Sequence, residues 1–301
     1  MIGAGALGSL FGALLADDGN AVWLLHHRPE VAATLDECGV VVEAADGTTR
    51  RIDVRATVDA AEVGTVDLAL VLVKSYATVE AVEEHAACVG PATRVLSLQN
   101  GVTNHHRLRE HVGAGRVLSG VTYQGASLSS PGHVVRSAPG PTRFGGEDSA
   151  FAGRLCEVFE SAGIEAEVVD DPFEAIWQKQ LWGAAIKPTA ALTRLPNREL
   201  VANEETAGVM HRLMRETAAV AETQDVDLDA DATSEVLRES LAGSSHVSSM
   251  LQDVEAGRRT EIDDVNGANV ALGREAGVDV PVNEVVTALV RGLERGYLDR
   301  D

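Results

Sequence analysis

The chain opens with a glycine pattern that restricts its possible folds more than any other feature. Gly3, Gly5 and Gly8 form G-x-G-x-x-G at the start of an apolar helical stretch, and a strand-like segment, "AVWLL", follows at residues 21–25. Glycines in this spacing permit a tight turn and let the backbone approach a pyrophosphate, while the helix start supplies free N–H groups and a positive dipole end. We therefore expect a dinucleotide site. Its contacts at this turn are Gly3, Gly5, Ala6, Leu7 and Gly8.

Only Met1 and Ile2 precede the turn, although a dinucleotide-binding fold has a strand there. Two explanations stay open: either the natural protein begins upstream of this methionine, or its first, central strand is strongly shortened. We favour an upstream start, and we expect a protein that begins at Met1 to fold poorly.

The end of the second strand carries cationic and titratable side chains where NAD-binding proteins usually carry an acid. His26, His27 and Arg28 follow "AVWLL". An Asp or Glu there accepts from the ribose hydroxyls and repels a 2′-phosphate, so its absence predicts NADP with Arg28 on the phosphate. An arginine that faces water at a strand end is the alternative. The adjacent histidines argue against a metal site, because neighbours on a strand point to opposite faces.

Strand-like and helical segments alternate up to residue 170. Residues 39–57 alternate in polarity around Asp46-Gly47, which is a hairpin signal. Helices are predicted near residues 76–88 and over Ser149–Ala162. Further strands are predicted in "VDLALVLVK", "TRVLSLQNG", "RVLSGVTYQGASL", "GHVVRSA", "PTRFGG" and "EAEVV".

The pattern changes after Asp170. Asp171-Pro172 is a helix start, and the remaining residues show only helical periodicity. We therefore predict an α/β fold: a Rossmann-type doubly wound sheet domain over residues 1–170, followed by an all-α helical domain over residues 171–301 that serves substrate binding and dimerisation.

The chain is strongly acidic, with 46 acidic against 25 basic residues and a formal net charge of −21 spread along its length. Salt screens the self-repulsion of such a surface. Scarce lysine with abundant acidic residues resembles the proteins of salt-loving organisms, so we expect a halophilic protein. The same surface argues against a nucleic-acid partner, because binding phosphates requires a basic footprint.

Several features place the protein in the cytoplasm. The apolar runs are far shorter than the roughly 20 residues that cross a bilayer, and the start lacks the regions of a signal peptide. We therefore expect no membrane partner. Cys38, Cys88 and Cys156 are odd in number, widely separated and without paired metal-ligand spacing, which predicts reduced core residues and no metal.

Lysine has almost disappeared from the chain, which retains only Lys74, Lys179 and Lys187 against 22 arginines. A lysine that persists in such a chain indicates a task for an ammonium with a tunable pKa, which a guanidinium cannot perform. Lys179, Gly183 and Lys187 are spaced by four and therefore lie on one helical face. Two cations on one face suit an anion and a carbonyl group.

Polar residues also follow two predicted strands. Lys74 comes after "LVLV", and Gln99 and Asn100 come after "VLSL". Ligands of a Rossmann sheet lie outside the carboxyl ends of the strands, so these side chains are candidates for the nicotinamide end of a cofactor, although an ordinary turn has the same composition. Farther on, Glu261, Asp263 and Asp264 form an acidic segment, and in so acidic a chain each carboxylate is by default solvated. Residue chemistry alone thus leads to a nucleotide-binding oxidoreductase with a lysine at its site.

A family resemblance extends this interpretation over essentially the whole chain. The segments "GAGALGSLFGALLADDG", "VLVKSY", "LSLQNGV", "WQKQLWGAAIKPTAAL" and "SSMLQDVEAGRRTEIDDVNGA" occur in the order and spacing of the ketopantoate reductase (2-dehydropantoate 2-reductase) family, which the chain resembles. The resemblance implies NADPH-dependent reduction of ketopantoate to pantoate, a step in pantothenate and coenzyme A biosynthesis.

The resemblance also implies roles for individual residues. Lys179 looks like the catalytic lysine and Glu261 like the active-site carboxylate. Lys74 and Asn100 resemble the strand-end residues that meet the cofactor and, for Asn100, the substrate. Ser249 is similar to a serine that helps to hold the substrate.

Two positions depart from the family pattern. The lysine is commonly followed four and eight residues later by asparagines that contact substrate, and here these positions are Gly183 and Lys187. Lys187 is therefore a candidate to bind the ketoacid carboxylate; the alternative is that it lies at a helix end before Pro188 and caps carbonyls. Three functions stay open: ketopantoate reduction, reduction of another 2-ketoacid on the same scaffold, and nucleotide binding without catalysis. The oligomeric state is also open, a homodimer included.

Overall fold

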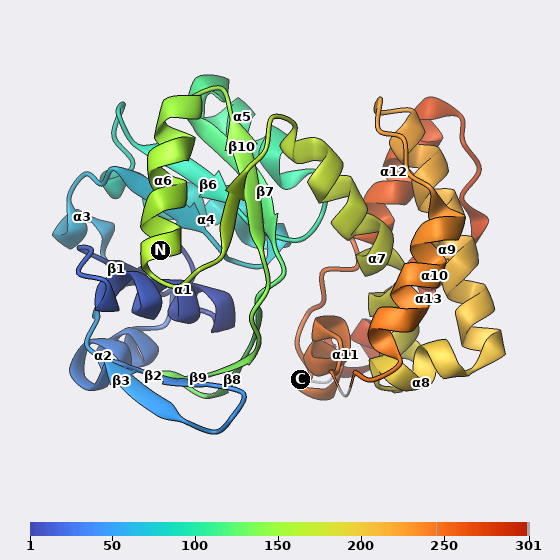
Figure 1. The fold of residues 1–301 in the computed structure, drawn as a ribbon, viewed down its shortest axis with the longest axis horizontal. Helices are drawn as coiled ribbons and strands as arrows, with labels where there is room; N and C mark the ends of the chain where they lie inside the picture. Colours follow the sequence, from blue (N-terminus) through green and yellow to red (C-terminus); the bar gives the residue numbers. More distant parts are fainter. Residues whose placement is uncertain (245, 300–301) are drawn as a thin grey trace. The chain divides into compact units, whose positions relative to one another are not determined.

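The computed structural model describes residues 1–244 and 246–299 (Figure 1). The chain divides into two compact units. We call residues Met1–Gln99 with Asn104–Ala175 the α/β unit, and residues Asn100–Thr103 with Ile176–Asp301 the helical unit. The predicted division of roles at residue 170 stays a prediction. None of the described helices is both long enough and apolar enough to span a membrane.

The strands of the α/β unit follow the predicted order, whereas its helices over residues 29–38, 60–63 and 104–112 lie where no helix was predicted. Its strands are β1 (Trp23–Leu25), β2 (Val40–Glu43), β3 (Thr49–Ile52), β4 (Arg55–Thr57), β5 (Leu68–Val71), β6 (Arg94–Ser97), β7 (Val117–Thr122), β8 (Gly125–Ser130), β9 (His133–Ala138), β10 (Thr142–Gly146) and β11 (Ala166–Val168). Its helices are α1 (Ala6–Asp17), α2 (Pro29–Cys38), α3 (Ala60–Val63), α4 (Thr78–Glu84), α5 (Asn104–Val112) and α6 (Ser149–Ser161), with the short 3₁₀ turn η1 at Ser75–Ala77.

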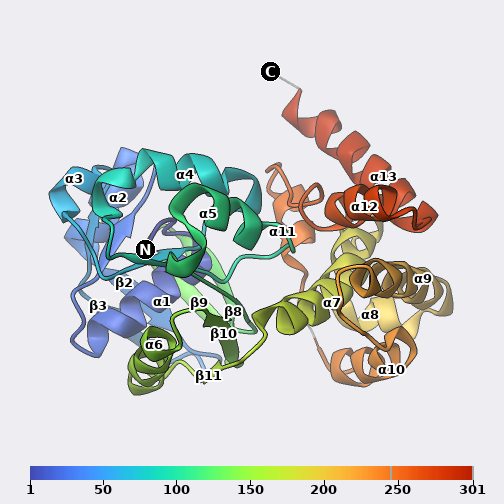
Figure 2. The same ribbon diagram turned by 90° about the horizontal axis from the view of Figure 1, so that it is seen from above.

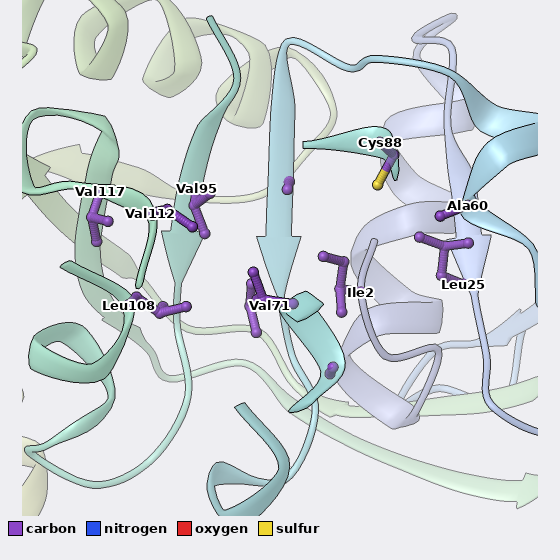
Figure 3. Close-up of a cluster of buried hydrophobic side chains, with 12 residues drawn as sticks. Ile2, Leu25, Ala60, Val71, Cys88, Val95, Leu108, Val112 and Val117 are labelled. Atoms are coloured by element: carbon purple, nitrogen blue, oxygen red, sulfur yellow. The ribbon is translucent and has the colours of Figure 1, made fainter. Parts of the chain in front are cut away.

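The main sheet has a single residue where its central strand would be. Five strands pair in the order β11-β10-β7-β6-β5, β1 pairs with β4, and Ile2 forms parallel bridges to both Leu25 and Val71. The Ile2 amide donates to the Leu70 carbonyl at 2.8 Å, and the Leu72 amide donates to the Ile2 carbonyl at 2.9 Å. Figure 3 shows Ile2 between the Leu25 and Val71 side chains in one buried cluster. Ile2 thus pairs with a strand on each side, at the position that a central strand occupies in this fold.

Helices cover both faces of this sheet, because apolar residues of its central strands point to both faces. Figure 2 shows α4 and α5 on one side of the strands and α1 and α6 on the other. Consecutive residues of a strand point to opposite faces, so each central strand contributes to two cores. One core contains Val71, Val95 and Val117 with residues of α4 and α5. The other contains Leu70, Leu96 and Leu118 with residues of α1 and α6.

A second sheet confirms the predicted hairpin. β2 and β3 pair antiparallel around Asp46 and Gly47, and the order of this sheet is β3-β2-β9-β8. Gly47 has φ +82°, and both the Thr48 amide and the Thr48 hydroxyl donate to Asp46 Oδ1. A positive φ and a side-chain acceptor are the reasons why Asp-Gly favours this turn.

The helical unit contains no strand among its described residues 100–103, 176–244 and 246–299. Its elements are most of α7 (Pro172–Thr193), α8 (Asn197–Ala202), α9 (Glu204–Glu222), α10 (Ala230–Leu241), α11 (Ser249–Glu255), α12 (Asn266–Ala276) and α13 (Pro281–Leu298). The predicted start of α7 is confirmed: the Phe173 amide donates to the Asp171 carboxylate at 2.8 Å. The fold prediction, a doubly wound sheet followed by an all-helical part, is confirmed.

Pro188 lies inside α7, so the expectation that Lys187 stands near a helix end is wrong. A proline within a helix has no N–H for the carbonyl four residues earlier, here that of Ala184. The side-chain amide of Asn266 donates to this carbonyl at 2.9 Å. The helix continues because a neighbouring helix supplies the hydrogen bond that the proline cannot make.

Buried amides extend this contact between helices of the unit. Asn266 also donates to Asn283 Oδ1, and Asn269 donates to Asn283 Oδ1 and to the Thr217 hydroxyl. Gln180 donates to the Val265 carbonyl at 2.8 Å and to Asn269 Oδ1 at 3.1 Å. Buried polar groups are costly unless they find partners, so this network fixes how α7, α9, α12 and α13 pack.

The cysteines require one correction. All three are free, as predicted, and Cys88 is buried in the core that Figure 3 shows. Cys38, however, is exposed at the end of α2, and Cys156 is half-buried. Cys38 is the last residue of α2 and follows the buried positions Val31, Ala32 and Leu35.

Candidate functional site

The glycine turn at the start of α1 has the geometry of a phosphate-binding loop. Gly3 has φ +100°, a conformation that favours glycine. A Cβ on Gly8 would lie 2.0 Å from the Gly3 carbonyl oxygen, so only glycine lets the helix approach the turn this closely. A Cβ on Gly5, in contrast, would meet no atom of the protein within 4 Å. The space at Gly5 is therefore open for a ligand, as the sequence pattern requires.

The amino end of α1 is prepared for an anion. Gly5 is its N-cap and provides no side-chain acceptor, and the first turn contains no acidic residue. The first N–H groups of a helix have no intrahelical partner and carry a positive partial charge. The backbone of this turn thus suits a pyrophosphate, and the assignment of Gly3, Gly5, Ala6, Leu7 and Gly8 to a dinucleotide stays a prediction.

Arg28 stands where β1 passes into α2, as its N-cap residue. Its side chain is about half exposed, and its Nε lies 4.0 Å from the Glu30 carboxylate, an exposed pair that holds it weakly. His26 Nδ1 accepts a hydrogen bond from the Arg28 amide at 3.0 Å. Burial, with His27 and Arg28 nearby, lowers the pKa of His26 to about 4, so His26 is neutral at neutral pH. Arg28 therefore supplies the fixed positive charge at this strand end.

The two predicted strand-end residues fall in different units. Lys74 follows β5 as the N-cap residue of η1 in the α/β unit. Asn100 follows β6 but belongs to the helical unit. Between them in sequence, Gln99 is buried and donates to the Val73 carbonyl and to the Thr78 hydroxyl, both at 2.8 Å. Gln99 therefore fixes the end of β6 beside β5. Its side-chain NH2 group is used in these two hydrogen bonds within the protein.

Asn100 and Glu261 meet although 161 positions separate them. Asn100 Nδ2 donates to Glu261 Oε2 at 3.1 Å, and Glu261 is only 6% exposed. The turn at Gly101 makes this contact possible: its φ is +89°, and a Cβ there would lie 2.6 Å from the Asp264 carbonyl oxygen. Gly101 thus positions Asn100, and the glycine of "QNG" at the end of a predicted strand is the sequence signal for this turn.

The carboxylates of the acidic segment around Glu261 differ in their exposure to solvent. Glu261 and Asp264 are buried, so the default expectation of solvated carboxylates is wrong for both. Asp263 agrees with it in part: it is partly exposed and pairs with Arg259 at 3.3 Å and with Arg291 at 2.7 Å. The single turn formed here, in which the Asp264 and Val265 amides donate to the Glu261 carbonyl, separates the side chains onto different faces.

Lys179 lies on α7 in an environment that disfavours its charge. Burial of the ammonium lowers the pKa of Lys179 to about 7; Lys187 lowers it further, and Glu261 opposes the shift. The structure thus brings together three of the predicted residues, Lys179, Lys187 and Glu261, with Asn100 on the carboxylate. A lysine whose pKa is lowered toward neutrality suits a group that transfers protons.

Two other predicted residues have clear positions. Gly183 lies on α7 between Lys179 and Lys187, and the Lys187 side chain extends over it. Ser249 is the first residue of α11 and is half-buried. The cap of that helix is Ser248, whose hydroxyl accepts from the Leu251 amide at 3.3 Å, so the Ser249 hydroxyl is not needed for capping. Within the described part of the chain no cluster of His, Cys, Asp and Glu could hold a metal ion.

These features define a class: an α/β dinucleotide-binding protein whose helical unit carries a lysine, a carboxylate and an amide at one site. Comparison with known proteins makes this specific. Residues 1–148 match the model of the family described as Ketopantoate reductase PanE/ApbA, and residues 172–294 match the model of its C-terminal part. The chain belongs to the ketopantoate reductase family.

Individual relatives agree over the full length. The chain is 35% identical to a 2-dehydropantoate 2-reductase of Halobacterium salinarum, with 97% of both chains covered, and 36% identical to one of Archaeoglobus fulgidus, with 98% and 97% covered. A ketopantoate reductase structure from Ralstonia eutropha superposes with a TM-score of 0.90 at 33% identity, with 98% of both chains covered. A D-mandelate dehydrogenase with NADH and anilino(oxo)acetate superposes with a TM-score of 0.92 at 25% identity, with 98% and 97% covered.

Proposed function

We propose that this protein reduces 2-dehydropantoate to pantoate with NADPH, and so serves pantothenate and coenzyme A biosynthesis. The observation that carries the proposal is the Lys179 site: an ammonium with a pKa near neutrality beside the buried Glu261, in a chain that matches 2-dehydropantoate 2-reductases from end to end. A protein that only binds nucleotides has no use for this pair, which speaks against the non-catalytic alternative.

The site residues divide the chemical work. A bound nicotinamide supplies a hydride to the ketone carbon, and negative charge then develops on the ketone oxygen. Lys179 is the group that stabilises this oxygen and donates a proton to it. Glu261 holds the ammonium in place between turnovers and favours its charged form. Asn100, oriented by Glu261, and Ser249 supply neutral hydrogen bonds to the substrate.

The cofactor we propose is NADP. The glycine turn holds the pyrophosphate through backbone N–H groups, and Lys74 is the strand-end cation for the rest of the dinucleotide. Arg28 carries the choice of cofactor, because it places a half-exposed guanidinium at the strand end where an acid would repel a 2′-phosphate. Planar guanidinium groups bind phosphate oxygens in pairs, which suits this task.

A second candidate is the reduction of a different 2-ketoacid. Gly183 and Lys187 favour it, since they remove two neutral hydrogen-bonding groups and add a cation. The likeness to a D-mandelate dehydrogenase with NADH supports it as well. In both cases the partner is a small ketoacid, and the acidic surface speaks against nucleic acid.

The test is NADPH oxidation by the purified protein with ketopantoate, in molar potassium chloride so that the Debye length falls to about 3 Å and the acidic surface is screened. NADH, and a panel containing pyruvate, 2-oxoisovalerate and benzoylformate, are measured in parallel. We expect ketopantoate to have the highest kcat/KM. A folded protein that binds NADPH but prefers benzoylformate or 2-oxoisovalerate would establish the second candidate instead.

Arg28→Ala tests the choice of cofactor within the same assay. The KM for NADPH should rise about 10- to 100-fold, the value of a lost charged hydrogen bond, while the KM for NADH stays nearly constant. Arg55→Ala, which removes an arginine that lies over the Trp23 ring at the other end of the same strand pair, is the matched control. Equal losses with both cofactors would reject the assignment of Arg28 to the phosphate.

A further inference from the structure

The hydroxyl of Thr78 connects the segments that follow two neighbouring strands, β5 and β6. Thr78 is the first residue of α4 and is only 1% exposed. Gln99 Nε2 donates to its hydroxyl at 2.8 Å, and the hydroxyl donates toward the Ser75 carbonyl at 2.8 Å and Asn104 Oδ1 at 2.9 Å. A hydroxyl has one hydrogen and can also accept, so a single buried group links three residues.

Gln99 and Asn104 stand where the chain leaves the α/β unit and where it returns. Gln99 is the last residue before the segment 100–103, which belongs to the helical unit, and Asn104 is the first residue after it. Both side chains are buried, and both contact the same hydroxyl. Thr78, which is 21 and 26 positions away from them in sequence, therefore holds the two ends of this short segment together.

Further hydrogen bonds fix the Gln99 side chain. Its Oε1 accepts from the Ser97 hydroxyl at 3.0 Å, and its Nε2 donates to the Val73 carbonyl at 2.8 Å as well as to Thr78. A buried amide is costly when it loses a partner, so this arrangement is well defined. We call Thr78, Gln99 and Asn104 the Thr78 junction.

The segment that the Thr78 junction holds carries one of the site residues. Asn100 donates to Glu261 Oε2 at 3.1 Å, and Gly101 has φ +89°. Val102 is only 3% exposed. Because its ends are fixed and its middle is buried, the segment has little freedom to move the Asn100 side chain. Such support matters at a site, since a small misplacement of a group that contacts substrate lowers the rate strongly.

We infer that Thr78 is a positioning residue, whose hydroxyl closes the base of the segment 100–103 and thereby holds Asn100 in the orientation that meets Glu261 and the substrate. Thr78 lies in the α/β unit and acts through the chain that continues from Gln99 and Asn104. The inference rests on the proposed function, because the role of Asn100 toward a ketoacid is part of it.

Thr78→Val is the principal test, because valine keeps the branched shape and removes only the hydroxyl. It should raise the KM for ketopantoate about 10-fold, the value of one lost hydrogen bond, with smaller changes in kcat and in NADPH affinity. Thr78→Ser keeps the hydroxyl and should restore most of the wild-type KM. A serine variant with the KM of the valine variant would assign the effect to packing and overturn the inference.

Thr93 provides the matched control, since it is a buried threonine just before β6, at the other end of that strand. Its hydroxyl donates to the Val66 carbonyl and accepts from the Gly90 amide at 3.0 Å. Thr93→Val should lower the melting temperature about as much as Thr78→Val and leave the KM for ketopantoate unchanged. An equal rise in KM for both valine variants would contradict a specific role for Thr78.

A double-mutant cycle shows whether Thr78 acts through Asn100. In the Asn100→Ala background, Thr78→Val should add little to the loss in kcat/KM, while its cost in urea unfolding should persist. The combination of coupled kinetics and independent stability losses distinguishes positioning from a structural role. Fully additive losses in kcat/KM would reject the inference.

Nuclear magnetic resonance reports on Asn100 without turnover. With asparagine isotopically labelled at its side-chain nitrogen, the Asn100 signal is identified by its loss in Asn100→Ala. Thr78→Val should shift this signal, whereas Thr93→Val and Thr78→Ser should leave it in place. An unchanged Asn100 signal in Thr78→Val overturns the inference. If the signal shifts as expected but the wild-type protein does not reduce ketopantoate, only the proposed substrate is rejected.

Discussion

The two units prepare for their ligands in different ways. The α/β unit offers backbone: a turn of glycines, the open space at Gly5 and the free N–H groups of α1. The helical unit offers side chains, whose charges are set by burial and by one another, as with Lys179 and Glu261. An atom added to the backbone site displaces either the neighbouring backbone or the ligand, whereas the side-chain site depends on charge and protonation. Substitutions in the α/β unit should therefore change stability or dinucleotide affinity. Substitutions at the site of the helical unit should change the turnover number and its pH dependence.

Lys179→Ala should produce the largest effect. Loss of the group that donates a proton and stabilises the oxygen should reduce kcat about 10²- to 10⁴-fold. NADPH affinity, measured by fluorescence titration, should change little, because the pyrophosphate is bound by the other unit. Lys179→Arg should restore little activity, since a guanidinium stays protonated and has a different shape. Normal turnover in the alanine variant would remove the site from the mechanism.

Gly8→Ala and Gly5→Ala should separate folding from binding in the α/β unit. A methyl at Gly8 has to displace the Gly3 carbonyl, which should cost about 1–3 kcal/mol in the free energy of unfolding. A methyl at Gly5 meets only open space in the protein, so unfolding should be unaffected while dinucleotide affinity falls. Urea unfolding and NADPH titration of both variants provide the measurement. Similar stability losses at both glycines would contradict the distinction between them.

Asn266→Ala should destabilise the helical unit by about 1–3 kcal/mol, because the Ala184 carbonyl, which Pro188 cannot serve, loses its donor. Pro188→Ala provides the control, since it restores a backbone N–H for that carbonyl. In the Pro188→Ala background the asparagine substitution should cost less, as a double-mutant cycle by urea unfolding can show. Identical costs in the two backgrounds would mean that Asn266 contributes through its other bonds.

The pH dependence should shift in opposite directions for the two neighbours of Lys179. Lys179 donates a proton only when charged, so kcat/KM should fall as pH rises through its pKa of about 7. Lys187→Gln removes a cation, raises the pKa of Lys179 and should move this decline to higher pH. Glu261→Gln removes an anion, lowers that pKa and should move the decline to lower pH. Movement in the same direction would assign the titration to a different group.

Stability should respond to the same proton. The folded pKa of Lys179 is below its unfolded value of 10.5, so between about 7 and 10.5 the unfolded chain binds more protons than the native one. The contribution of Lys179 to the free energy of unfolding therefore increases with pH across this interval. Wild type and Lys179→Met, compared by urea unfolding, should differ in this slope.

Local patterns made much of the fold predictable. The helix after the glycine turn, the Asp46-Gly47 hairpin and the Asp171-Pro172 helix start each depend on residues that are close in sequence, and the structure confirms these three elements. The prediction from Pro188 was wrong because it also used only neighbouring residues. A proline favours the end of a helix, but α7 continues because Asn266 from α12 donates a hydrogen bond to the Ala184 carbonyl.

The sequence by itself determined most strands, the glycine turn before α1 and the shared face of Lys179 and Lys187, because helix and strand periods and glycine conformations act over a few residues. Only the tertiary structure decided that Asn100 meets Glu261, that Glu261 is buried, and that Lys187 lies over Gly183 toward Lys179. Burial and charge depend on segments distant along the chain, and these set the pKa on which the proposed chemistry rests.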